Sequence, residues 1–207
     1  AKPHLYLRRM DQSAAKPITG TEGGINPFLS PDDRWVGFWA DRQLRKIPVE
    51  GGVATALCSA PSIFGASWGR DNSIVFANGS RAGLSRVSSE GGEPETLTVP
   101  DLKKEESSHR LPSWLPNGKA VLFTVMREFF DAQPRVAVLQ TQTQKWEYLL
   151  DDAADARYVH TGHLVFVSKG ILKAVGFNLN DLRVTGQPVP LIENIMQALN
   201  SISTEHN

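Results

Sequence analysis

Short, wholly apolar runs recur along the chain, and each follows a turn rich in Pro, Asp, Asn or Gly. Each run contains one phenylalanine at or near its end, and these residues are Phe38, Phe76, Phe123 and Phe166. The steps between them are 38, 47 and 43 residues. A repeat of about 40–50 residues built from short strands is typical of a β-propeller, with one four-stranded blade in each repeat. The pattern therefore predicts an all-β fold made of four-stranded antiparallel blades.

The apolar runs do not alternate with polar residues, as a strand with one wet face would. We therefore expect each run to be the second strand of a blade, covered on both sides by neighbouring blades. The turn before each run needs residues that tolerate unusual backbone angles. Such pairs occur in all four repeats, as Asp32-Asp33, Asp71-Asn72, Asn117-Gly118 and Thr161-Gly162. We expect each run to be followed by a third strand, a hairpin turn and a more polar outer strand. In two repeats the hairpin turn has the sequence Glu-Gly-Gly, at Glu50 to Gly52 and Glu90 to Gly92.

One propeller domain is predicted over residues 1–207, with four whole blades and part of a fifth. The predicted units are a half blade at 1–20, blades at 25–58, 63–98, 109–151 and 155–192, and a closing strand or tail at 193–207. A mixed-charge segment, Pro100 to Ser108, is expected to be a solvated loop between blades. Four and a half blades allow three outcomes: a small closed ring, pairing with another copy, or a piece cut from a larger propeller. The start without a methionine favours a piece of a longer protein. Because an uncovered strand edge or blade face is a template for pairing, we also expect self-association.

The motif Ser30-Pro31-Asp32-Asp33-Arg34-Trp35 resembles the Ser-Pro-Asp-Gly-Arg/Lys signature of WD40-like repeats in TolB-type propellers, with Asp33 in place of the usual Gly. A further resemblance, to the propeller region of bacterial eukaryotic-like Ser/Thr protein kinases, covers nearly the whole chain. It rests on segments that include Leu115–Thr124, Ala156–Leu164 and Val184–Pro190. This resemblance implies a sensor or interaction module, usually outside the membrane in the parent protein. The kinase motifs themselves are absent, so no catalytic residue is carried over.

Charge and composition exclude several classes of function. Lys+Arg and Asp+Glu are equal at 22 each, so no net field attracts nucleic acid. No apolar run approaches the roughly 20 residues that cross a bilayer as a helix, so no membrane insertion is expected. Cys58 is the single cysteine, which excludes an internal disulfide or a multi-thiolate metal site, and we expect it to be a buried small hydrophobe.

Two pairs of residues are the candidates to face the channel or a ligand. His109 and Arg110 stand where the chain enters a first strand, the part of a blade that lines the channel. For His109 a buried, hydrogen-bonded structural role is the favoured alternative. Arg157 and Tyr158 stand at the corresponding place in the last predicted blade.

No catalytic, cofactor or metal site is predicted. The Gly-x-Ser-x-Gly string at Gly65–Gly69 lies inside a β repeat, whereas a nucleophile elbow needs a strand-to-helix turn. His160 and His163 flank a turn and do not share a helix face, which argues against zinc. The aspartates lack the spacing of a calcium loop and suit propeller turns. Four of the five tryptophans fall on or beside inner and second strands, where packing between blades explains them.

The leading expectation is a non-enzymatic module that binds a protein, peptide or small molecule. The alternatives are a propeller enzyme of lactonase or hydrolase type with a site at the channel mouth, or the propeller cap of a serine peptidase. An enzyme should present converging acids or histidines on the first strands. Those strands are poor in acids, as in Asn26–Leu29 and Pro112–Leu115, which favours binding.

Overall fold

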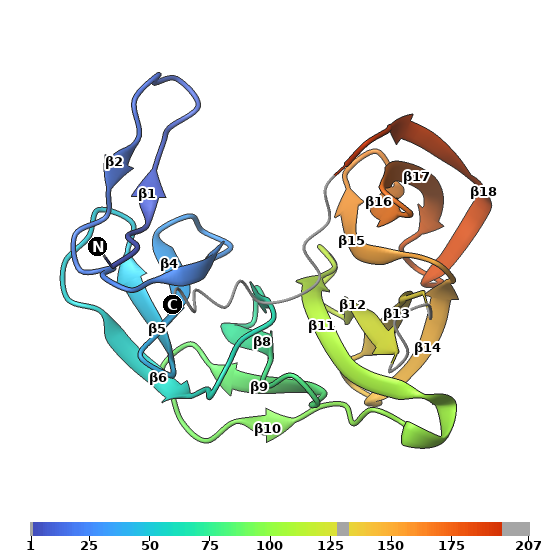
Figure 1. Cartoon of the computed structure of the whole chain (residues 1–207), viewed down its shortest axis with the longest axis horizontal. Coiled ribbons are helices and arrows are strands. Elements are labelled where there is room, and N and C mark those ends of the chain that lie inside the picture. Colours follow the sequence, from blue (N-terminus) through green and yellow to red (C-terminus); the bar gives the residue numbers. More distant parts are fainter. Residues whose placement is uncertain (1, 128–132, 196–207) are drawn as a thin grey trace, which may run out of the picture.

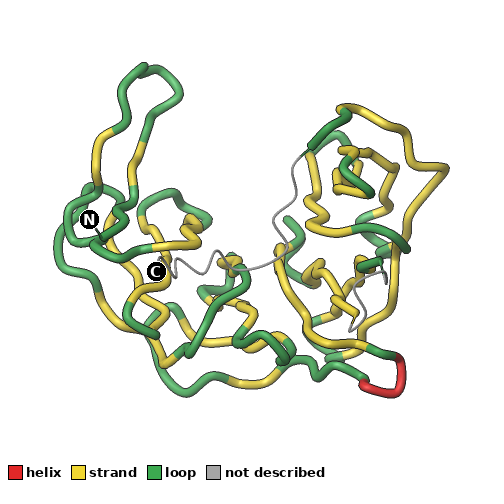
Figure 2. The backbone as a smooth tube through the Cα atoms, in the orientation of Figure 1, coloured by secondary structure: helices red, strands yellow, loops and turns green. Residues whose placement is uncertain are grey.

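The computed structural model describes residues 2–127 and 133–195 and contains a half-blade followed by four complete blades, each an antiparallel sheet in sequence order. Nearly all of its regular structure is strand, and the single helical element of the described residues is a short 3-10 turn, η1 (Leu102–Lys104), drawn red in Figure 2. The half-blade is β1 (Tyr6–Leu7) and β2 (Lys16–Pro17); blade 1 is β3 (Ile25–Leu29), β4 (Trp35–Ala40), β5 (Gln43–Pro48) and β6 (Thr55–Ser59); blade 2 is β7 (Ala66–Trp68), β8 (Ser73–Ala77), β9 (Leu84–Ser88) and β10 (Glu95–Thr96); blade 3 is β11 (Glu106–Trp114), β12 (Ala120–Arg127), β13 (Arg135–Gln140) and β14 (Lys145–Leu150); blade 4 is β15 (Ala154–Val159), β16 (His163–Ser168), β17 (Ile171–Asn178) and β18 (Arg183–Ile192).

The blades follow one another around an arc, with the half-blade at one end and blade 4 at the other (Figure 1). The predicted closing strand or tail at 193–207 falls almost entirely on residues 196–207, outside the described residues. The two strands of the half-blade are only two residues long, shorter than the sequence suggested. Of the described residues, no helix has the length and apolar character needed to cross a membrane. The arrangement is that of a partial β-propeller, so the predicted fold class is confirmed.

Packing between blades explains why the second strands lack polar alternation. The four repeat phenylalanines are at most 2% exposed, and each is the fourth residue of its second strand. On β12, Phe123 packs in a cluster with blade 2, whereas the adjacent Leu122 packs in a cluster with blade 4. On β8, Phe76 likewise faces blade 1 and Val75 faces blade 3. The second strands of blades 2 and 3 are therefore buried on both of their faces, as predicted, whereas β16 of blade 4 is fully buried on one face only.

The turns between first and second strands use the left-handed backbone region that their sequences anticipated. The second residue of each predicted pair has a positive φ: 58° at Asp33, 61° at Asn72, 66° at Gly118 and 80° at Gly162. Asp and Asn tolerate this region better than most residues, and Gly adopts it without steric cost. Asp33 can therefore occupy the position that glycine holds in the resembling motif.

The two Glu-Gly-Gly turns fasten each blade to the one before it. Gly52 donates its backbone N–H to the Thr19 carbonyl at 3.1 Å, and Gly92 donates to the Leu57 carbonyl at 3.0 Å. The φ values repeat almost identically, 92° and 134° in the first turn and 90° and 134° in the second. Only glycine adopts such angles readily, so the repeated dipeptide reflects a repeated contact between neighbouring outer edges.

Blade 3 begins earlier than expected, because Glu106 to Ser108 form the start of β11. The expectation of a solvated loop through Ser108 is wrong at this point: Glu106 is 1% exposed. Its carboxylate accepts hydrogen bonds from the Asp101 backbone N–H at 2.6 Å and from the Tyr148 hydroxyl. Internal donors thus replace water around a charge that the sequence alone places in solvent.

Blade 4 has one covered side and one uncovered side. Leu164 and Phe166 of β16 pack against blade 3, whereas Val165 and Val167 point the other way and are only partly buried. The strand register places Leu172 and Ala174 of β17 beside those valines, and Val189 and Ile192 of β18 beside these in turn. Val189 and Ile192 are each 54% exposed. We call Val165, Val167, Leu172, Val189 and Ile192 the uncovered side of blade 4; none of them belongs to a buried cluster of the described residues.

Candidate functional site

The structure places His109 inside the protein, between blades 2 and 3. Its ring is fully buried and lies between the Phe123 and Trp146 rings, with centroid distances of 4.9 and 5.3 Å. The Thr98 hydroxyl is 2.7 Å from Nδ1, and a Glu106 carboxylate oxygen is 3.3 Å from Nε2. The Thr98 oxygen already accepts the Leu84 N–H, so we assign the Thr98 hydroxyl as the donor to Nδ1. Nδ1 is then the unprotonated nitrogen of the ring, and Nε2–H donates to Glu106. Burial lowers the pKa of His109, which agrees with this neutral form.

Arg110, the neighbour of His109, also ties blade 2 to blade 3. It is 8% exposed, and its guanidinium carbon lies 4.1 Å from the centre of the Phe64 ring. Its Nε donates to the Ser108 hydroxyl at 2.9 Å, and Nη2 donates to the Ser80 carbonyl at 3.3 Å. Its burial and these bonds leave Arg110 little freedom to meet a ligand in the channel.

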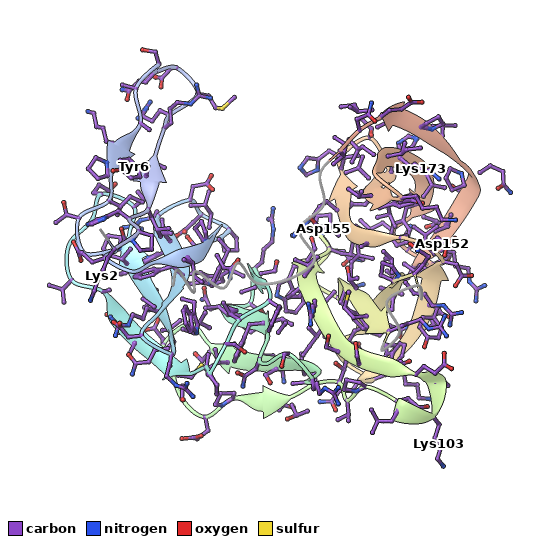
Figure 3. All side chains as sticks on the ribbon, viewed as in Figure 1. Lys2, Tyr6, Lys103, Asp152, Asp155 and Lys173 are labelled. Atoms are coloured by element: carbon purple, nitrogen blue, oxygen red, sulfur yellow. The ribbon has the colours of Figure 1, made fainter. Side chains whose placement is uncertain are left out.

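Arg157 and Tyr158 make contacts within blade 4. Arg157 is exposed, and its Nη2 lies 2.7 Å from a carboxylate oxygen of Asp155. Figure 3 shows Asp155 on the inner side of the arc, where β15 runs. Tyr158 is half-buried and packs edge-on against Phe177, with ring centroids 6.2 Å apart. Of the four sequence candidates, His109, Arg110 and Tyr158 are largely occupied by packing, and Arg157 is paired with Asp155.

A groove with a volume of about 630 Å³ lies between blades 1 and 2. It opens on the face of the arc that carries the turns between first and second strands. Ligand sites for small molecules typically measure about 300–1,000 Å³. The residues that line it and matter here are Asp32, Trp35, Lys46, Trp68, Arg70 and Glu90.

Two turns with fixed hydrogen bonds place Asp32 and Arg70 at the groove. Asp32 accepts the Ser30 hydroxyl at 2.6 Å and the Arg34 backbone N–H at 3.2 Å, and these bonds lower the pKa of its carboxyl. In the equivalent turn of blade 2, Asp71 accepts the Ser73 N–H at 3.1 Å and so fixes the loop that carries Arg70. Both loops are anchored by their own aspartates, so the groove walls are preorganised.

Lys46 and Glu90 form an ion pair between the two blades. Lys46 Nζ lies 2.8 Å from the Glu90 carboxylate and 4.9 Å from the centre of the Trp35 ring. The Gly92 contact with Leu57 brings the Glu90 turn to this position. The hydrogen bond from Lys46, followed by its charge, lowers the pKa of Glu90. Both groups are consequently charged and satisfied at neutral pH.

One charged group at the groove has no partner in the described part of the chain. Arg70 is exposed and makes no side-chain hydrogen bond or ion pair within residues 2–127 and 133–195. Trp68 lines the same groove but is only 8% exposed, and its Nε1–H, which has no acceptor, is enclosed by the protein. The groove thus offers the Arg70 guanidinium, with tryptophan rings nearby, to an incoming molecule.

Both carboxylates of the groove are engaged by neighbouring groups. Asp32 is held by its own turn and Glu90 by Lys46, so neither carboxylate is free to move a proton. Among the described residues no three His, Cys, Asp or Glu side chains gather closely enough to hold a metal ion. Reasoning from the sequence missed this site because its residues come from two repeats. The usable signal was the pair of aligned turns, each with a tryptophan beside it.

Comparison with known proteins supports the fold. No family model matches the chain, and no curated protein sequence matches it. Among solved structures, TolB from Acinetobacter baumannii is similar with a TM-score of 0.70 and 15% identity over 94% of this chain. A protein described as TolB from Agrobacterium tumefaciens gives a TM-score of 0.74 and 13% identity over 93% of this chain. The chain spans 50% of the first protein and 75% of the second.

Other similar structures are propellers with different printed functions. Regucalcin from Agrobacterium tumefaciens, described as a calcium-binding protein, has a TM-score of 0.62 and 15% identity, over 83% of this chain and 60% of that one. A gluconolactonase and a puromycin-hydrolysing peptidase also occur among them. At these identities the likeness establishes a TolB-like propeller fold and leaves the activity open.

Proposed function

We propose that the chain is a non-enzymatic binding module and that its ligand occupies the groove between blades 1 and 2. The observation that carries the proposal is a preorganised cavity of about 630 Å³ that is lined by two tryptophans and by Arg70, a cation without a partner among the described residues. Convergent polar groups in a cavity lined by aromatic rings are the usual features of a ligand site.

In this proposal, the module is part of a larger bacterial signalling protein, such as a Ser/Thr kinase. The resemblance of Ala156–Leu164 and related segments to kinase propellers supports it, as does a chain that spans half of the Acinetobacter TolB. The sensor role follows from the same resemblance. A ligand held between two blades would change how firmly those blades pack, which is a signal that a covalently joined domain can sense.

The proposal is tested by following the five tryptophan indole N–H signals by NMR in protein labelled with ¹⁵N. Each signal is assigned with a Trp→Phe variant. The probes are capped pentapeptides with an acidic, a basic, an apolar or a polar central residue. We expect at least one probe to shift the signals of Trp35 and Trp68 while leaving that of Trp146, in blade 3, unchanged.

Failure of every probe to shift Trp35 or Trp68 would overturn the groove as the binding site. The enzyme alternative is addressed in parallel with δ-gluconolactone as substrate. Hydrolysis above the buffer rate that a groove substitution abolishes would replace binding with catalysis, whereas we expect no such activity.

A further inference from the structure

We propose that the ligand recognised by the groove carries a carboxylate next to an apolar group, as an acidic side chain of a peptide does. This inference rests on the proposed function and specifies the chemistry of its ligand. It follows from the charges of the groove, from the donors that remain unused, and from the rings beside them.

The charges that line the groove include two acids and two bases, and three of these four are already satisfied. Lys46 and Glu90 neutralise each other at 2.8 Å. Asp32 is held by the Ser30 hydroxyl and the Arg34 N–H. Arg70 alone has no partner in the part of the chain that the structure describes. Asp32 keeps its negative charge but is bonded to its own turn, so the guanidinium of Arg70 is the group left for a ligand to pair with, and its complement is an anion.

A carboxylate fits the unused groups better than a phosphate does. The guanidinium of Arg70 presents two parallel N–H groups, which match the two oxygens of a carboxylate. A phosphate dianion needs more donors than one guanidinium supplies, and Arg70 is the one cation of the groove without a partner among the described residues. The carboxylates of Asp32 and Glu90 line the same groove and repel a double negative charge more strongly than a single one.

The tryptophan rings define the second half of the ligand. The Trp35 ring already receives Lys46 on one face, and Trp68 is buried to 8% exposure between the blades. Aromatic rings at a cavity wall favour apolar or flat groups. A short aliphatic stem between the carboxylate and the main chain, as in glutamate with apolar neighbours, brings both features together in one segment.

The test uses a capped tripeptide, Leu-Glu-Leu, and its isostere Leu-Gln-Leu, each titrated into the ¹⁵N-labelled chain. We expect the glutamate peptide to shift the Trp35 and Trp68 signals and the glutamine peptide to bind at least tenfold more weakly. Arg70→Ala should weaken the glutamate peptide about tenfold, and Arg70→Lys by less, because lysine keeps the charge but loses the paired donors. Arg34→Ala is the matched control, an exposed cation of the neighbouring turn that does not line the groove, and it should bind as the parent does.

Further titrations distinguish a peptide from a small acid as the source of the carboxylate, and they distinguish failure of the carboxylate preference from failure of the groove as a binding site. Free glutarate that shifts the same signals as strongly as the peptide would assign the site to a small acid, and a phosphoserine tripeptide that binds more tightly would overturn the preference for carboxylate. Equal shifts by the Glu and Gln peptides, unaffected by Arg70→Ala, would refute the carboxylate and leave the groove as a binding site. If none of the peptides and acids moves Trp35 or Trp68, both the inference and the proposed function fail.

Discussion

Glu106→Ala should destabilise the protein more than any other replacement of a single acidic residue in the described chain. The carboxylate is almost completely buried and accepts from His109 Nε2, the Asp101 N–H and the Tyr148 hydroxyl. Without it, the His109 N–H has no acceptor in a site closed to water, which costs about 1–3 kcal/mol. Asp101 and Tyr148 are partly exposed and can turn to solvent, so each loses about 0.5–1.5 kcal/mol. The expected loss is about 3–5 kcal/mol, the range for breaking one side of a buried charged network.

Urea unfolding measures this loss, followed by tryptophan fluorescence and by far-UV circular dichroism in parallel. Trp146 reports locally, since its ring lies 5.3 Å from both His109 and Tyr148. Coincident curves from the two probes establish that the transition can be treated as two-state. Glu106→Gln is the matched control, because it keeps one acceptor oxygen and nearly the same shape, and it should lose about half as much stability.

The reasoning is refuted if Glu106→Ala changes the free energy of unfolding by less than about 0.5 kcal/mol, the usual effect of a surface substitution. It is also refuted if Glu106→Gln and Glu106→Ala lose the same amount, because then the acceptor oxygen contributes nothing. Tyr148→Phe provides a further check, since it removes only the hydroxyl donor and should cost about 1 kcal/mol.

Other consequences of the structure can be measured in the same way. Replacing any of the repeat phenylalanines by alanine should cost about 3–5 kcal/mol in urea unfolding, and two nearly neutral replacements would show that the repeat register is wrong. The pKa of His109 is lowered in the folded state, so below the ordinary histidine pKa of 6.5 the unfolded chain binds more protons than the folded chain. The free energy of unfolding should therefore fall as the pH drops below about 6.5, and His109→Gln should remove this part of the pH dependence. Burial, with a smaller contribution from Glu93, raises the pKa of Cys58 to about 11, so at pH 8 roughly a thousandth of it is thiolate, and disulfide-exchange reagents should react with it far faster in urea than in buffer. Two copies should associate through the uncovered side of blade 4, because the same apolar surface on both copies is self-complementary; light scattering should show a dimer that Val167→Lys dissociates, and a monomer at all concentrations would contradict this.

The sequence was informative wherever a feature repeats and silent where residues of different repeats meet. The second strands could be located because they lack polar alternation, which burial on both sides explains in blades 2 and 3, and because all four phenylalanines occupy the same place in them. The turns could be located because a left-handed position restricts the choice of residue, as at Asn72 and Gly118. These constraints act between residues that are close in the sequence, so each produces a recognisable pattern within about ten residues.

Contacts between repeats produce no such pattern. Glu106 follows another glutamate and two lysines, so its neighbours in sequence indicate a solvated loop, although its partners in space include Tyr148, 42 residues away. The groove depends on Lys46 meeting Glu90 across 44 residues, and on Arg70 finding no partner at all in the described chain. His109 and Arg110 were singled out for a channel because polar residues on a first strand suggest one. In the structure the same polarity serves to join two blades.

The uncovered side of blade 4 also determines the order in which the molecule comes apart. Among residues 2–127 and 133–195, blades 1, 2 and 3 are each held by two neighbours, whereas blade 4 is held through a single cluster shared with blade 3. In an arc of this kind the cost of opening one unit is its own stability plus the interfaces that it gives up. Blade 4 gives up one interface where an inner blade gives up two, so amide hydrogens of β16 and β17 should exchange through partial openings that leave β8 and β12 intact. The chain would then behave less as one cooperative domain than as a row of units that is released from its exposed end.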